Sequence, residues 1–110
     1  MSNKFFRKAL ISAANTEEII YTVPEANTGL LKSLRVTNDS GSRASIFIRQ
    51  YSAGSATAHL LTNGFILPNG ASFDLFNGIT CVLEAGDELE VEASEADVTF
   101  YLSYLEVDRT

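Results

Sequence analysis

The sequence predicts an all-β protein: a single antiparallel β-sandwich, jelly-roll or immunoglobulin-like, with about seven to nine strands. Three observations favour this class. Apolar and polar residues alternate in short runs, and Gly, Asn, Asp and Pro interrupt these runs at close intervals. No window of about 15 residues shows helical periodicity. A chain of 110 residues has the usual size of one domain with one core.

The front half of the sandwich is expected to begin at residue 18, and residues 1–17 form either an extended N-terminal arm or a first strand. Residues 18–23 are rich in β-formers, and Pro24 ends this strand because proline has no N–H for the ladder. Residues 25–29 are expected as a loop. We therefore divide the chain into an N-terminal segment, 1–17, and a sandwich domain, 18–110.

The next two strands are separated by a turn at Asn38-Asp39-Ser40-Gly41. Residues 44–51 form a strand with a purely apolar middle. In the strand at 30–37, simple alternation predicts two faces. One face carries Leu30, Lys32, Leu34 and Val36, and the other carries Leu31, Ser33, Arg35 and Thr37.

The back half contains three Asn-Gly pairs, which predict tight hairpin turns because both residues accept positive φ angles. The pairs are Asn63-Gly64, Asn69-Gly70 and Asn77-Gly78. Residues 79–83 and 88–93 flank a further turn at 85–87. The last strand, 98–107, is apolar on both faces. We expect it to be central, covered on one side by the other sheet and on the other by a neighbouring subunit.

Composition disfavours most enzymes. The single Cys81 cannot form an internal disulfide or a Cys-rich metal site, and the single His59 excludes a His-pair metal motif. A net charge of −6 repels a phosphate backbone, which argues against nucleic acid as a partner. Residues 9–14 are too short an apolar stretch for a signal peptide or a membrane span. We expect a soluble, non-enzymatic protein made in a cytoplasm, with no cofactor and no membrane partner.

Charge is distributed unevenly along the chain. Residues 1–50 hold seven basic and four acidic side chains, whereas residues 51–110 hold one basic and ten acidic ones. Such asymmetry can mark two faces of opposite sign, which suits the docking of one copy on another. Alternatively, strands from the two halves interleave and mix the charges. On the first reading, the acidic strand of one copy meets Lys32, Arg35 or Arg43 of another.

The acidic strand at 88–92 places Glu88, Glu90 and Glu92 on one face, with Leu89 and Val91 pointing inward. The favoured interpretation is the solvated face of a half-buried strand. A contact with Lys32 or Arg35 of a neighbouring subunit is a second interpretation. A calcium site or the acid pair of a glycosidase is a third, although no Asp-x-Asp-x-Asp-Gly loop accompanies it. We therefore expect no metal.

A serine-type catalytic triad is not expected. His59 lies near Ser52, Ser55 and Thr57, with Asp74 farther along the chain, but no Gly-x-Ser-x-Gly elbow is present. Cys81 is expected to pack as a small apolar core residue.

The N-terminal segment holds the one cluster of basic and aromatic residues: Lys4, Phe5, Phe6, Arg7 and Lys8. One interpretation is an arm whose phenylalanines fill a neighbour's groove, or whose backbone adds a strand to a neighbour's edge. The other is a first strand with one exposed face. For an arm, deletion of residues 1–8 should weaken attachment and leave the sandwich folded.

Several motifs resemble small β-proteins encoded among the virion genes of tailed bacteriophages, including marine and cyanobacterial phages. The resemblance covers about residues 18–107. The matching motifs are Val-Pro at 23–24, Leu-Lys-Ser-Leu-Arg-Val-Thr-Asn at 31–38, Ser-Gly at 40–41, Leu-Pro-Asn-Gly-Ala-Ser at 67–72, Leu-Glu-Ala-Gly-Asp at 83–87 and Phe-Tyr-Leu-Ser-Tyr-Leu-Glu at 100–106.

The resemblance implies a non-enzymatic virion component and transfers no catalytic residue. Its most specific implication is a head decoration (cement) protein, which binds the capsid exterior and clamps neighbouring capsomers. Such a protein is expected to bind the major capsid protein or another virion protein, and to form a homo-oligomer, with a trimer favoured by analogy. The alternative is a neck, tail or fibre module, possibly one that binds glycans through Tyr21, Tyr51 or Phe65.

Overall fold

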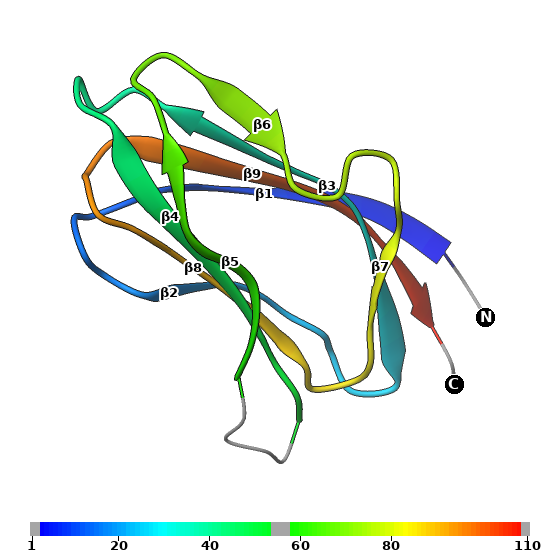
Figure 1. Cartoon of the computed structure of the whole chain (residues 1–110). Helices are drawn as coiled ribbons and strands as arrows, with labels where there is room; N and C mark the ends of the chain where they lie inside the picture. The colour runs from blue at the N-terminus through cyan, green and yellow to red at the C-terminus, as the bar shows by residue number, and fades with distance from the viewer. Residues whose placement is uncertain (1–2, 54–57, 109–110) are drawn as a thin grey trace.

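The structure is a computed structural model that describes residues 3–53 and 58–108, and the described residues form nine β-strands in two sheets (Figure 1). The described residues contain no helix that could cross a membrane. The strands are β1 (Asn3–Ile11), β2 (Glu18–Thr22), β3 (Asn27–Asn38), β4 (Ala44–Tyr51), β5 (Ala58–Leu67), β6 (Ser72–Asp74), β7 (Cys81–Leu83), β8 (Glu88–Ala93) and β9 (Val98–Asp108).

The strand order is that of a jelly roll. Sheet A has the order β1-β9-β3-β6, with β7 also paired to β3, and sheet B has the order β2-β8-β4-β5. Both β6 and β7 pair with β3, at Arg35–Thr37 and Gly29–Leu31 respectively, and so occupy one strand position. With these two counted as one, each sheet has four strands and the chain passes repeatedly between sheets. The predicted all-β sandwich is confirmed.

The core lies between the two sheets and consists of aliphatic and aromatic side chains from both. The central strand β9 contributes Val98, Phe100, Leu102 and Tyr104, and β8 contributes Leu89, Val91 and Ala93. Because β9 lies between β1 and β3, its predicted central position is confirmed. Its outer face is incompletely covered within one copy, since Tyr101 is 38% exposed.

The two faces predicted for the strand at 30–37 are wrong because β3 contains a bulge. Leu31 pairs with Tyr104 and Ser33 pairs with Ser103, so Lys32 is an extra residue in this strand. A bulge reverses the alternation at one point. Leu31 therefore points into the core together with Leu34 and Val36, while the Lys32 side chain is exposed.

The glycine of each Asn-Gly pair adopts a positive φ angle, but of the three asparagines only Asn77 does so, and none of the pairs closes a hairpin. Gly64 (φ 75°) forms a bulge inside β5, between the pairs Ile46↔Phe65 and Phe47↔Asn63. Gly70 (φ 82°) lies in the connection between β5 and β6, which belong to different sheets. Asn77 and Gly78 form a tight turn between β6 and β7, which both pair with β3 instead of with each other.

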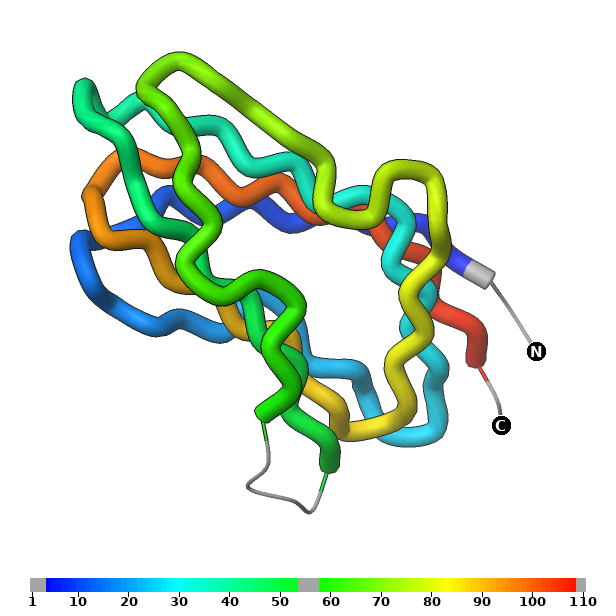
Figure 2. Tube along the Cα trace, in the orientation of Figure 1, coloured from blue at the N-terminus to red at the C-terminus, as the bar shows by residue number. Residues whose placement is uncertain are grey.

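Residues 3–11 of the N-terminal segment form strand β1 of sheet A. Along its whole length β1 pairs with β9, from Asn3↔Val107 to Ile11↔Thr99. Figure 2 shows the two strands running side by side, with both chain ends at the same end of the sandwich. Phe6 stacks on Tyr104 at a ring-centroid distance of 5.4 Å, and Lys8 Nζ lies 5.7 Å from the centroid of the Tyr21 ring.

Candidate functional site

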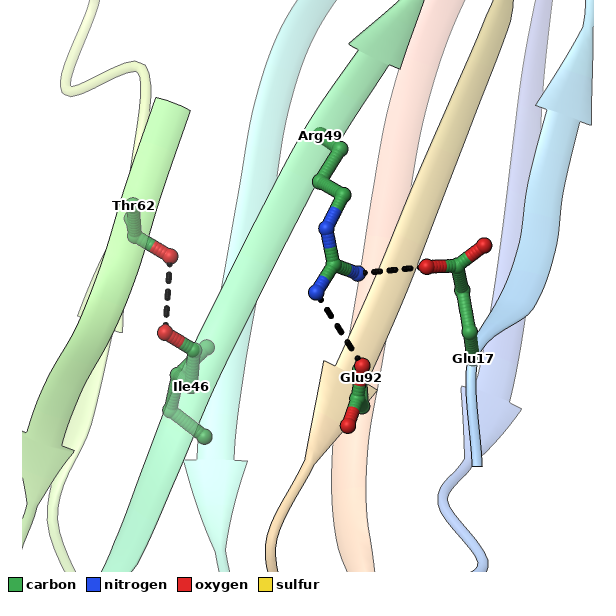
Figure 3. A network of polar contacts seen from close by, with 5 residues as sticks. All are labelled: Glu17, Ile46, Arg49, Thr62 and Glu92. Carbon is green, nitrogen blue, oxygen red and sulfur yellow. Dashed lines mark hydrogen bonds and ion pairs between the residues drawn. The ribbon is translucent and has the colours of Figure 1, made fainter. Parts of the chain in front are cut away.

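The outer face of sheet B, called face B here, carries a cluster of carboxylates around one arginine (Figure 3). Arg49 on β4 reaches across β8, and its guanidinium forms ion pairs with Glu17 (2.8 Å) and Glu92 (3.2 Å). The same guanidinium lies 5.6 Å from the centroid of the Phe47 ring. One arginine thus serves several carboxylates, and face B keeps an excess of negative charge.

Glu90 is the buried member of this cluster. Its register partners are Ile19 on β2 and Arg49 on β4, and only 8% of the residue is exposed. Burial raises the pKa of Glu90 to about 7, helped by a hydrogen bond with Glu17 and by the nearby charges of Glu17 and Glu88. The favoured interpretation of the acidic strand as a solvated face is therefore wrong at Glu90, while Leu89 and Val91 do point inward.

We expect Glu90→Gln to stabilise the protein at pH 8 and to have little effect at pH 4.5. A pKa above the ordinary value of 4.5 means that the folded chain holds this proton more tightly than the unfolded chain. Stability contributed by Glu90 is therefore lost as pH rises from 4.5 through 7. The glutamine removes that loss, a gain of the order of 2 kcal/mol in urea unfolding at pH 8. The exposed Glu25→Gln is the control, and an equal effect of both variants would contradict the assignment.

The outer face of sheet A, called face A, carries an apolar row across four strands. Opposed residues of antiparallel neighbours point to the same side, and the pairs Phe5↔Leu105, Leu105↔Leu30 and Leu30↔Val82 follow one another. Phe5 is 77% exposed and Val82 59% exposed. At about 4.8 Å between strands, the row is about 14 Å long.

Charged residues beside this apolar row are mostly basic. Arg7 and Arg35 are exposed on β1 and β3, and Arg7 Nη1 donates to the Tyr101 hydroxyl at 3.4 Å. The exposed Lys32 is hydrogen-bonded to Thr80. The carboxylate of face A is Asp74, which pairs in register with Arg35. Burial would raise the pKa of Asp74, but hydrogen bonds from Leu34 N–H, Ser33 and neighbouring amides outweigh it and lower that pKa.

A third exposed feature is the edge of sheet B, together with the groove beside it. β5 is the terminal strand of this sheet, its ten residues include no Asp, Glu, Lys or Arg, and it exposes four large apolar side chains. These are Leu60, Leu61, Phe65 and Ile66. The groove has a volume of about 400 Å³ and is lined by Leu61, Leu75, Phe76, Ile79, Thr80 and Cys81. We call this strand and its groove the β5 edge.

The structure divides most of the predicted interaction residues between the two sheets. Lys4, Phe5, Phe6, Arg7 and Lys8 lie on β1, and Lys32 and Arg35 lie on β3, so all seven belong to sheet A. Glu88, Glu90 and Glu92 lie on β8 in sheet B. Arg43 lies in the connection between β3 and β4. Sequence reasoning missed Arg49 and Glu17, although the alternation of Arg49 with Ile46 and Ile48 could have placed it on the outer face.

The other residues considered for catalysis or ligand binding are not brought together into a site. His59 is exposed on β5, whereas Asp74 is hydrogen-bonded on β6 of the other sheet; Ser55 and Thr57 lie outside the described residues. Burial raises the pKa of the Cys81 thiol, which packs against the core. Tyr21, considered as a sugar platform, is 2% exposed and donates to Glu106 at 2.7 Å, so that interpretation is wrong. Within residues 3–53 and 58–108, no group of three acidic, His or Cys side chains is placed to hold a metal ion.

Comparison with known proteins identifies the fold. No protein-family model matches the chain, and no curated protein matches it by sequence. A chain of the Bacillus endospore appendages, described as disulfide-linked pili, matches with a TM-score of 0.57 and 14% identity, covering 99% of this chain and 88% of that one. The VP2 subviral particle of infectious bursal disease virus matches with a TM-score of 0.57 and 8% identity, covering 96% of this chain.

The chain spans about a third of the length of VP2, since the match covers 31% of it. A pentameric capsid protein from metagenomic phage sequences matches with a TM-score of 0.45 and 20% identity, over 87% of this chain and 60% of that one. At the identities of the pilus and VP2 matches, the likeness shows the fold alone. This chain has a jelly-roll fold that is shared with VP2 of infectious bursal disease virus and with a pilus protein.

Proposed function

We propose that this chain is a non-enzymatic structural protein of a bacteriophage virion, a decoration (cement) protein that binds the head exterior and clamps neighbouring capsomers. The motifs of residues 18–107 that resemble phage virion proteins support the phage assignment. The jelly-roll fold, shared with VP2 of a subviral particle and with a pilus protein, suits a subunit of a larger assembly. The protein acts as a homo-oligomer, for which a trimer is favoured, and resides in the virion.

The observation that carries this proposal is the β5 edge. A long terminal strand without charges is a template for pairing with another chain, although the two register shifts between β4 and β5 partly blunt this edge. Here large apolar side chains and an apolar groove accompany it. A stable partner that covers this edge removes the exposed apolar surface from water. We assign the capsid as that partner.

The test uses virions of the phage that encodes the chain and capsids that lack it. Mass spectrometry of purified virions should find the chain in a fixed ratio to the major capsid protein. Full-length protein should bind the capsids lacking it, and Leu61→Lys should weaken this binding by about tenfold or more, because a charge in the interface loses its hydration.

Ser42→Lys, which adds the same charge in the exposed connection between β3 and β4, is the matched control and should bind normally. Absence of the chain from virions overturns the proposal. Presence in tail fractions alone overturns the assignment to the head. Equal binding by both variants overturns the assignment of the β5 edge.

A further inference from the structure

The two outer faces of the sandwich carry opposite charge. Face A presents Arg7, Lys32 and Arg35 against Asp74. Face B presents Glu17, Glu88, Glu90 and Glu92 against Arg49. Strand pairing within the two sheets produces this separation of charge, which does not follow the two halves of the sequence. Arg49, from the basic half, belongs to the acidic face, and Asp74, from the acidic half, belongs to the basic face.

Each face also carries exposed apolar side chains. Face A has the row Phe5, Leu105, Leu30 and Val82, and face B has Ile19 and Leu60 at either end of one register row, each about half exposed. Charge of opposite sign and apolar patches on both sides are the composition of a protein–protein interface with a polar rim. The partner that fits face A is therefore a surface with the composition of face B.

We propose that face A of one copy docks on face B of a second copy. This inference rests on the proposed function for its setting in a virion. It deepens that function by naming the contact between copies. The contact joins two different surfaces, so it is heterologous and head-to-tail. Such contacts close into a ring, for example a trimer, or continue as an open filament, depending on the rotation between copies. Leu60 belongs to both face B and the β5 edge, whereas Leu61 and the groove of the β5 edge remain available for the capsid.

The sequence hypothesis that the acidic strand meets Lys32, Arg35 or Arg43 of another copy is changed in two respects. Arg43 lies in the connection between β3 and β4, not on face A, and Arg7 takes its place. Arg49 already neutralises part of the acidic strand within one copy. Glu88, which is paired in register with Thr22 and Tyr51, is consequently the carboxylate we assign to the contact.

The experiment uses two charge-reversed variants of the full chain, analysed by sedimentation at low and high salt. The first, Arg7→Glu with Arg35→Glu, reverses face A. The second, Thr22→Lys with Glu88→Lys, reverses the charge of the part of face B around Glu88, the carboxylate assigned to the contact. Each variant alone should self-associate about tenfold more weakly than the wild type, because like charges then face each other. An equimolar mixture should regain assembly, since each reversed face then meets an opposite charge on the other variant.

Rescue in the mixture is a result that misfolding cannot produce, and circular dichroism with thermal melting checks each variant alone. Wild-type assembly should weaken as salt rises. The inference is overturned if the mixture fails to assemble, or if the variants assemble as well as the wild type. A wild type that stays monomeric yet binds capsids overturns this contact and leaves the proposed function standing. A wild type that assembles through this contact but is missing from virions overturns the proposed function and leaves this contact standing.

Discussion

Deletion of residues 1–8 is expected to lower the free energy of unfolding by the order of 3 kcal/mol and to make the protein prone to aggregation. The deletion removes the ladder from Asn3↔Val107 to Lys8↔Leu102, so β9 becomes an unpaired edge over most of its length. It also removes the Phe6 ring that covers Tyr104. Phe6 is 40% exposed, so the loss of its ring costs less than the roughly 1.5–3 kcal/mol of a fully buried side chain, and the lost strand pairing adds to it.

This result differs from the expectation for an extended arm, in which the truncated sandwich stays folded. Phe5→Ser is the informative control, because this ring is 77% exposed on face A. That substitution should change stability by less than about 0.5 kcal/mol while it weakens self-association. Urea unfolding and light scattering of both variants give the comparison. A truncated chain as stable and as soluble as the full chain would show that β1 is dispensable to the sandwich.

Local features of the fold were predictable from the sequence because they depend on near neighbours in the chain. The strand at 44–51 has the predicted bounds, and the glycines of the three Asn-Gly pairs have the positive φ angles that glycine favours, although Asn77 is the one asparagine of the three that shares them. The partners of these segments were not predictable in the same way. A glycine with positive φ specifies its own backbone conformation alone, and both a bulge in β5 and a turn between β6 and β7 satisfy it.

The acidic cluster shows the same limit. Alternation along β8 correctly separated the glutamates from Leu89 and Val91. It could not reveal that Glu90 is buried, because burial there depends on β2 and β4, which cover it from both sides. Nor could alternation identify Arg49 as the partner of Glu17, since those residues are 32 positions apart. The bulge at Lys32 likewise arises from pairing between β3 and β9, which are distant in sequence.

Asn38 is a buried polar residue whose importance the sequence showed only as part of a turn motif. Its side chain is fully buried, and Nδ2 donates to the carbonyls of Ser42 (2.7 Å) and Leu67 (2.8 Å). Its Oδ1 accepts from the N–H of Ser40 at 3.0 Å. One amide therefore ties the connection between β3 and β4 to the end of β5.

Asn38→Leu is expected to destabilise the protein by about 3 kcal/mol, which lowers the urea midpoint by roughly 2 M. The buried Leu67 carbonyl loses its side-chain donor in this variant, and the turn at Ser40 loses its acceptor. Asn38→Asp keeps the size of the side chain and changes its hydrogen bonding. At pH 8 its carboxylate faces two carbonyl oxygens, whereas protonation at pH 4 returns one donor. This variant should therefore recover stability as pH falls. Asn69→Ala, which removes an exposed bond to Gly41 N–H, should cost less than about 1 kcal/mol. If the three variants behave alike, the shape of the turn and not the buried amide network holds the end of the sandwich.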